Sequence, residues 1–461
     1  MARTNTSSVS AFGMKDRLGY MFGDFGNDFT FMLSSMFMMK FYTDIMGLSA
    51  GVVGMLMMVA RFVDAFTDVT MGQIVDRSRP TKDGKFRPWI KRMCGPVAIA
   101  SFLMYQSGLE GMSYGFKVAY MIVTYLLWGS VFYTSINIPY GSMASAISEK
   151  PEDRTSLSNW RTIGATLGNI AIGVILPLFV YYTDSEGKQW LSGTRMSIAA
   201  VICSVLAVIC YLLCYNLVTE RVKIEQKTEK FSVMFLVNSL IQNKALIGIA
   251  VTSLFLILAQ ISLGNMGAYL YPNYFRNIAI LSVISLIGHM ITLAMSPFIE
   301  TFAKKIGKKE IAIVASVLGA VPMLVAFVLH TKNVIVWMVC YCITWVGVSM
   351  FILICWAMIT DVIDDTEVKT GSRSDGTVYS IYSFCRKLGQ ALSSGLTGVL
   401  LSMVGYSTAT AFDTPVVNGI YNITCLVPGI AFVLMFLSLV FLYPLNKKKV
   451  EENAKKLLEK R

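Results

Sequence analysis

Residues 61–72 read RFVDAFTDVTMG and place two aspartates, Asp64 and Asp68, inside an otherwise apolar run. The run starts with AGVVGMLMMVA at residues 50–60 and continues to Asp76. Four residues make about one helical turn, so the two carboxylates share one helix face and stand roughly 6 Å apart along the axis. A carboxylate in a membrane span costs about 2.5–3.5 kcal/mol and almost always faces a cavity. The stretch therefore predicts a membrane protein with a polar site between its helices.

The composition of the chain indicates that lipid is its main solvent. Of 461 residues, 55% are hydrophobic and only 15% are charged, whereas about a quarter are charged in a soluble domain. The net charge of +12 comes from short basic clusters between apolar runs, which fits lipid headgroups and argues against a nucleic-acid partner. The nine cysteines lie mostly in apolar runs, and only two histidines are present. We therefore expect reduced cysteines, no enzymatic site and no cofactor.

Apolar runs of about 20 residues, long enough to cross a ~30 Å hydrocarbon layer, recur along the whole chain. Twelve such runs lie near residues 19–44, 50–75, 90–109, 117–143, 157–182, 194–217, 245–271, 279–302, 311–329, 333–358, 376–404 and 419–443. They predict an all-α integral membrane protein with 12 transmembrane helices. The polar N-terminal residues MARTNTSSVSAFGMK contain no apolar signal core, so no cleaved signal peptide is expected.

The loops predict the orientation and the division of the chain. Basic connections such as DRSRPTKDGKFRPWIKR follow even-numbered spans, so both termini are expected in the cytoplasm, with the chain in the cell (inner or plasma) membrane. A basic turn follows both the second span and the eighth, as in a duplicated six-helix unit of major facilitator architecture. We predict a six-helix bundle at 1–217, a cytoplasmic loop at 218–244, a second six-helix bundle at 245–443 and a basic cytoplasmic tail at 444–461.

Polar residues within the predicted spans are candidates for a transport site. Thr134 and Asn137, three apart on the fourth span, share a helix face. With Asp64 and Asp68 they could supply oxygen ligands for Na⁺, or the carboxylate pair could bind a proton. Ordinary hydrogen bonds and ion pairs between helices would explain the same residues. The other charged candidates are Asp24, Asp28, Arg161 and Lys387.

Several motifs, in order and at matching spacing, carry a family resemblance. They are GDFGNDF, FYTDIMGLSAGVVGMLMMVARFVDAFTDVTMGQIVDR, GKFRPWI, NIPYGS, DRTSLSNWR and SIYSFCRKLGQA. From about residue 17 to 390 the chain resembles the glycoside–pentoside–hexuronide:cation symporters, which include the melibiose permeases. NIPYGS together with SFCRKLGQA is more similar to the glucuronide-type branch.

The resemblance implies roles for individual residues. The cation site is implied at Asp64, Asp68, Thr134 and Asn137, and the sugar site at Asn27, Asp28, Asn137, Arg161 and Lys387. We add to the predicted sugar site Asp24, Tyr133, Tyr382 and Ser383; the two tyrosines could stack on a sugar ring, although tyrosine is also common at membrane interfaces. Asn137 stands where melibiose permeases carry an aspartate, Asn27 where they carry a lysine, and Gly141 where they carry a tryptophan. These three departures argue against melibiose itself as the substrate. A cytoplasmic gate between Arg154 and the acidic pair Asp361 and Asp364 is also implied, although a solvated acidic helix end would explain that pair as well.

The sequence thus predicts a secondary active transporter that imports a glycoside, oligosaccharide or hexuronide with Na⁺ or H⁺ by alternating access. Its partners would be a small sugar, a monovalent cation and membrane lipid. Two alternatives stay open. One is a carrier of lysolipids or other amphiphiles on the same scaffold, and the other is a non-transporting membrane sugar sensor. The sensor would need a signalling domain, for which the tail after Pro444 is short.

Overall fold

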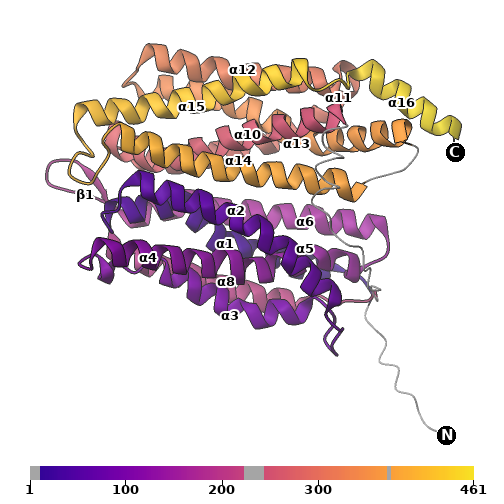
Figure 1. Cartoon of the computed structure of the whole chain (residues 1–461), viewed down its shortest axis with the longest axis horizontal. Helices are drawn as coiled ribbons and strands as arrows, with labels where there is room; N and C mark the ends of the chain where they lie inside the picture. Colours follow the sequence, from indigo (N-terminus) through magenta and orange to yellow (C-terminus); the bar gives the residue numbers. More distant parts are fainter. Residues whose placement is uncertain (1–10, 223–242, 371–374, 461) are drawn as a thin grey trace, which may run out of the picture. The chain divides into compact units, whose positions relative to one another are not determined.

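The computed structural model describes residues 11–222, 243–370 and 375–460, and these residues are almost entirely helical (Figure 1). The α-helices are α1 (Met14–Asp44), α2 (Ala50–Arg77), α3 (Arg87–Leu103), α4 (Tyr114–Leu126), α5 (Thr134–Ile147), α6 (Pro151–Ile170), α7 (Leu176–Val180), α8 (Gly193–Leu217), α10 (Lys244–Tyr269), α11 (Ala279–Ile306), α12 (Lys308–Leu329), α13 (Val334–Thr370), α14 (Asp375–Met403), α15 (Thr414–Phe441) and α16 (Lys447–Lys460). Two π-helical turns, η2 (Leu127–Tyr133) and η3 (Ala171–Ile175), join helices end to end. A third, η4 (Leu270–Tyr274), extends the end of α10, and η1 (Ser107–Leu109) is a short 3₁₀ turn.

A helix overlaps each of the twelve ranges predicted as spans. In the described residues, nine helical segments are long and apolar enough to cross a membrane. The segments that overlap the other three predicted spans are α1, α3 and α14. Helix α3 has only 17 residues, and polar residues such as Asp24 and Asp28 lower the hydropathy of α1. The helical fold predicted from the apolar runs is confirmed.

The described chain packs as two compact units. Unit 1 comprises Met1–Phe41, Val63–Val180 and Ser192–Glu229, and unit 2 comprises Tyr42–Phe62, Tyr181–Leu191 and Lys230–Arg461. In unit 1, α3 packs against α8 and α5. In unit 2, α10 packs against α14 and α15, and α12 packs against α13 and α15 (Figure 1).

Small residues bring the first part of α2 into backbone contact with α14 inside unit 2. A Cβ added to Gly54 would lie 2.7 Å from the Cα of Gly398, so only glycine fits at that crossing. One turn away, the backbone N–H of Gly51 donates to the Oγ of Ser402 at 2.8 Å. Such small-residue contacts are a common way for helices to associate in lipid.

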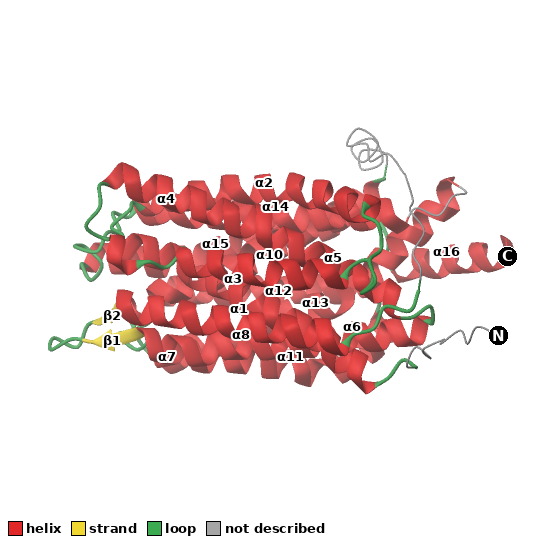
Figure 2. Cartoon of the chain, turned by 90° about the horizontal axis from the view of Figure 1, so that it is seen from below, coloured by secondary structure: helices red, strands yellow, loops and turns green. Residues whose placement is uncertain are grey.

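A short antiparallel hairpin that the sequence did not reveal follows α7 (Figure 2). Strands β1 (Tyr181–Thr183) and β2 (Gln189–Leu191) pair over three residues each, and Gly187 turns the chain with φ of 73°, a left-handed conformation that favours glycine. Within unit 2, the Oε1 of Gln189 accepts from the backbone N–H of Ile278 at 2.5 Å. Trp190 meets Phe412 edge-on at 4.8 Å. The hairpin is therefore docked on unit 2, although the chain leaves and re-enters unit 1 on either side of it.

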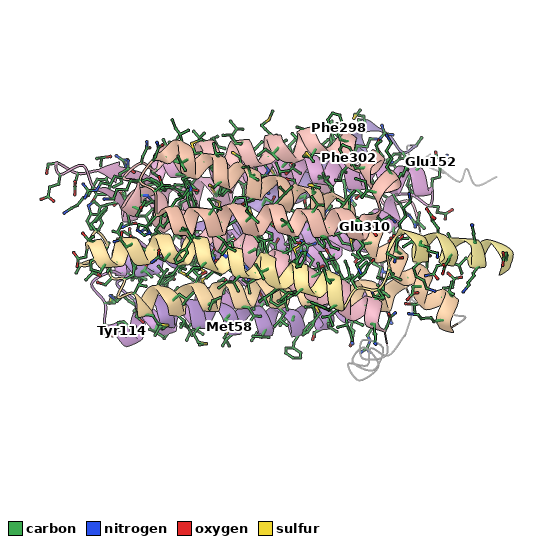
Figure 3. All side chains as sticks on the ribbon, turned by 90° about the horizontal axis from the view of Figure 1, so that it is seen from above. Met58, Tyr114, Glu152, Phe298, Phe302 and Glu310 are labelled. Atoms are coloured by element: carbon green, nitrogen blue, oxygen red, sulfur yellow. The ribbon has the colours of Figure 1, made fainter. Side chains whose placement is uncertain are left out.

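Apolar side chains are exposed on the outer surfaces of the helices. Phe298 and Phe302 on α11 are 58% and 44% exposed and project from the outer face of their helix (Figure 3), as expected for a surface in contact with lipid. The predicted basic tail is largely helical, and its helix α16 contacts α13, where the side-chain amide of Asn453 donates to Asp365 at 3.0 Å.

Candidate functional site

The two aspartates of the opening stretch are held by hydroxyl groups within unit 1. Asp64 is 7% exposed, and its Oδ1 accepts a hydrogen bond from the hydroxyl of Ser130. One turn along α2, the Oδ1 of Asp68 accepts from the hydroxyl of Thr134 at 2.8 Å. Carboxylate oxygens of α2 therefore face hydroxyl oxygens of η2 and of the first residue of α5. This is the kind of donor set that binds a hard cation or a proton.

The π-helical turn η2 brings these hydroxyl groups onto one side. The backbone N–H of Thr134 donates to the carbonyl of Gly129, five residues back, so Gly129, Ser130 and Thr134 all lie toward α2. A Cβ added to Gly129 would lie 3.4 Å from the Oδ1 of Asp64, in van der Waals contact, so Gly129 lies directly beside the carboxylate. Single π-helical turns are frequent at functional sites, because they re-aim side chains within a continuous helix.

Neutral oxygens would have to complete any metal coordination there. In the described ranges, no group of three or more His, Cys, Asp or Glu residues is placed to hold a metal ion. A monovalent cation bound between Asp64 and Asp68 would therefore take its other ligands from hydroxyl, carbonyl or solvent oxygens.

A second polar cluster in unit 1 joins α1 to α6. The Nε of Arg161 donates to the Oδ1 of Asp24 at 3.1 Å. The Asp24 side chain is 11% exposed and that of Arg161 is 42% exposed. The guanidinium lies 5.4 Å from the centre of the Tyr140 ring, which in turn stacks on Tyr20 at 4.7 Å. The guanidinium is thus oriented along one edge by a carboxylate and across one face by a ring.

Asp28, one turn beyond Asp24, is positioned by a neutral group. Its Oδ2 accepts from the side-chain amide of Asn169 on α6 at 3.0 Å. A Cβ added to Gly168 would lie 2.5 Å from the Cβ of Asp28, so glycine is what lets α1 and α6 approach here. The sequence analysis singled out neither Asn169 nor Gly168, although Asn169 follows Arg161 by eight residues and so repeats its helix face.

Two hydrogen bonds among neutral side chains link α1, a helix of the second cluster, to α8 and α5. The hydroxyl of Tyr211 on α8 donates to the Oδ1 of Asn27 at 2.9 Å, and the amide of Asn27 donates to the Oδ1 of Asn137 at 3.4 Å. Asn137 lies three residues beyond Thr134 on α5. The predicted site residues of unit 1 thus lie on either side of the Asn27–Asn137 hydrogen bond. On the α1 side are Asp24, Asp28, Asn27 and Arg161, and on the α5 side are Asp64, Asp68 and Thr134.

Tyr133, the aromatic sugar-site candidate of unit 1, lies beside two other rings. Tyr133 stacks on Phe31 at 5.7 Å and contacts Trp128 at 5.3 Å. Trp128 is completely buried, so its ring is core rather than a surface for a sugar.

The remaining sugar-site candidates lie on α14 in unit 2. Tyr382 is 2% exposed, its hydroxyl lies 3.2 Å from the sulfur of Cys355, and its ring meets Trp356 edge-on at 5.4 Å. Ser383 and Lys387 follow on the same helix, one turn apart, and both are partly exposed.

Two of the three gate residues, Asp361 and Arg154, have close partners within their own units. Asp361 on α13 pairs with Lys308 of α12 at 2.6 Å, and Asp364 follows one turn later. Arg154, expected in a loop, lies in the first turn of α6, and its Nε donates to the carbonyl of Ser148 at 2.9 Å. Lys308 was missed because the basic stretch KKIGKK reads as a solvated turn.

Comparisons with known proteins agree in pointing to transporters. The model of the family described as MFS/sugar transport protein matches residues 19–447. An uncharacterized symporter of Bacillus subtilis (strain 168) is 31% identical, with 97% of this chain and 96% of that protein covered. The glucuronide carrier protein homolog of Escherichia coli (strain K12) is 28% identical, with 94% and 93% covered.

Solved structures support the fold. A nucleoside transporter superposes with a TM-score of 0.63 at 14% identity, covering 92% of this chain and 98% of that one. A D-xylose–proton symporter superposes with a TM-score of 0.55 at 14% identity, covering 93% and 96%. With a family model that spans most of the chain and relatives of full length, this multi-pass membrane protein belongs to the MFS/sugar transport protein family, as a symporter of the glycoside–pentoside–hexuronide:cation type.

Proposed function

We infer that the chain is a cation-coupled sugar symporter, and we propose that it imports a glycoside, oligosaccharide or hexuronide by alternating access. Relatives named as a glycoside/cation symporter of Escherichia coli and an isoprimeverose transporter of Lactiplantibacillus pentosus, each 28% identical over almost the whole chain, support this function. Family membership also favours a transporter over an enzyme. The coupling ion and the residues that carry transport are the finer part of the proposal.

The observation that carries the proposal is that two charged clusters lie in one compact unit, with the Asn27–Asn137 hydrogen bond joining the helices that bear them. The Asp64–Asp68 cluster has the oxygens to bind a cation, and the Asp24–Arg161 cluster has donors and acceptors suited to sugar hydroxyls. Asn137 lies between them and contacts Asn27. Occupancy of one cluster can therefore alter the geometry of the other, which is what symport requires.

We favour Na⁺ over H⁺ as the coupling ion. Two carboxylates and two hydroxyls, from Ser130 and Thr134, supply four to six oxygens when the carboxylates bind with one or both atoms. A proton would need only one of these acids. Each cation that moves down a 100 mV inside-negative potential contributes about 2.3 kcal/mol to sugar accumulation.

The membrane arrangement forms part of the proposal. Twelve spans, a cytoplasmic loop at 218–244, which falls mostly outside the described residues, and two cytoplasmic termini would follow from the basic loops. Arg154 with Asp361 and Asp364 would form the cytoplasmic gate, and Tyr382, Ser383 and Lys387 would supply the sugar contacts of α14.

The test is uptake by proteoliposomes that contain the purified protein. Inward Na⁺ and H⁺ gradients are imposed separately, against a panel of labelled glycosides and hexuronides. We expect accumulation above equilibrium with the Na⁺ gradient, and its loss in Asp64→Cys and Asp68→Cys. Accumulation driven only by the pH gradient would make the pair a proton site. If no sugar accumulates under either gradient, the proposed function is wrong.

A further inference from the structure

The charge balance of the sugar cluster in unit 1 bears on the kind of sugar that it binds. The cluster contains two carboxyls, Asp24 and Asp28, and one guanidinium, Arg161. Arg161 already pairs with Asp24 at 3.1 Å, so its charge is locally neutralised. Whether Asp28 is ionised or protonated, the three groups together carry no net positive charge.

Asp28 has no cation within hydrogen-bonding distance in the described residues. The hydrogen bond that holds it comes from the neutral amide of Asn169, whose nitrogen also donates to the carbonyl of Ala165 at 2.8 Å. The group that orients the carboxyl by a hydrogen bond is therefore neutral. One of its oxygens accepts from Asn169, and the other can accept from a ligand hydroxyl.

An anionic sugar would face an unfavourable environment there. A uronate carboxylate loses its hydration on entry and needs a positive partner to offset that loss. The guanidinium that could serve is already engaged at its Nε by Asp24, and Asp28 would repel the anion when ionised. A neutral sugar has no such cost, since its hydroxyls can accept from the Nη groups of Arg161 and donate to Asp28.

Resting on the proposed function, we propose that the transported sugar is a neutral glycoside, and that Asp28 is the residue that excludes hexuronates. Asn169 is a positioning residue that orients the Asp28 carboxyl without neutralising it. Asp24 contributes indirectly, because it holds the charge of Arg161 in an ion pair.

The experiment is a competition assay with matched pairs of sugars on the full-length protein in proteoliposomes. Each pair consists of a methyl glycoside and the corresponding methyl glycosiduronate, of glucose and of galactose, and each competes for uptake or binding of the best labelled glycoside. In wild type the neutral member of the better pair should compete at least tenfold more strongly than the uronate. Equal or stronger competition by the uronate in wild type overturns the proposal. If the uronate competes in this way and Lys387→Gln abolishes its binding, the compensating charge comes from α14, and the proposal is again overturned.

Two variants test the role of charge against that of shape. Asp28→Asn keeps the shape of the side chain and should shrink the preference for the neutral sugar about tenfold, and Asp24→Asn should shift it in the same direction by releasing Arg161. Asn169→Ala is the matched control, because it removes an orienting hydrogen bond but no charge, so the affinity for both members of a pair should fall by the same factor.

An unchanged preference in Asp28→Asn rejects the assignment of Asp28. If Asp28→Asn does not assemble, the wild-type ratio decides. Uptake that is retained but prefers uronates refutes this inference alone, whereas absence of any sugar uptake refutes the proposed function.

Discussion

At the scale of single residues, the cation cluster depends on hydroxyl groups as much as on its carboxylates. Asp64 is buried, and the hydroxyl of Ser130 donates a hydrogen bond to its carboxylate within unit 1. A hydrogen bond to a charged group contributes about 1.5–3 kcal/mol, so removing the donor to a buried carboxylate destabilises the folded protein by about that amount. Ser130 therefore contributes to the site although it carries no charge.

Replacing Ser130 by alanine should weaken cation binding about tenfold, since 1.4 kcal/mol corresponds to a factor of ten in affinity. The measurement is the cation concentration that gives half-maximal sugar uptake. Ser142→Ala is the matched control, because the exposed Ser142 hydroxyl donates only to the carbonyl of its own helix, at Ile138. Equal cation dependence in the two variants would show that Ser130 is not part of the site.

Glycine contacts allow a second test at this scale. Gly168→Ala would place a methyl group 2.5 Å from the Cβ of Asp28 and push the carboxyl aside, so sugar affinity should fall at least tenfold. Gly141→Ala has open space around the added methyl and should bind sugar normally. Protein yield and thermal stability are compared in both, so that a folding defect is recognised. Similar sugar affinities in two stable variants would remove the Asp28 contact from the sugar site.

The sequence allowed part of the polar site in unit 1 to be predicted. Asp64 and Asp68 stand out because they interrupt an apolar run, and the structure places both beside hydroxyls. Tyr211 could not be predicted, because it is 184 residues from Asn27 and lies in an apolar helix where a tyrosine is unremarkable in composition. Contacts of this kind follow from tertiary packing and leave no local pattern.

At the scale of elements, the β1–β2 hairpin is the feature that hydropathy does not predict, because strands of three residues are too short to show alternation. Asp184 organises its turn. Its Oδ1 accepts from the backbone N–H groups of Glu186 and Lys188, and its Oδ2 accepts from the indole N–H of Trp190 at 2.8 Å. The indole hydrogen bond is the main reason that the pKa of Asp184 lies below its ordinary value of 3.8.

This hydrogen bond predicts an acid transition in the hairpin. Because the pKa is lowered by folding, the ionised carboxylate stabilises the hairpin above pH 3.8, and this stabilisation is lost as the pH falls through the lower value of the folded state. The signal of Trp190, taken as the difference in indole fluorescence between wild type and Trp190→Phe, should titrate below that pH. Asp184→Asn should abolish the titration, and a transition that persists in this variant would assign it to another group.

The π-helical turn η2 is likewise invisible to a search for helical periodicity, since a run of apolar residues reads the same whether or not one turn is widened. Thr134 was predicted from its residue type and from the family resemblance. Its alignment with Gly129 and Ser130 follows from the five-residue hydrogen bond that η2 makes. A sequence pattern could give the residue but not the direction in which it points.

At the scale of the whole molecule, the distribution of Lys and Arg predicts an orientation that reporters can test. Alkaline phosphatase is active only outside the cytoplasm, so a fusion after Arg461 should be inactive and an insertion after Glu186 in the hairpin turn should be active. A green fluorescent protein at the same sites should give the opposite result. An active phosphatase at the C-terminus would contradict the predicted topology.

The glycine contact between α2 and α14 has a consequence for biosynthesis. Gly51 and Ser402, which share a hydrogen bond, are 351 residues apart, so at 5–20 residues per second a ribosome needs roughly 20–70 s to supply the partner. Throughout that interval the first part of α2 has left the ribosome without the helix that its glycines fit. Its narrow glycine face must meanwhile be covered by lipid or by the insertion machinery. Translation that slows before residue 402 should therefore lengthen the period in which the nascent chain is open to quality-control proteases.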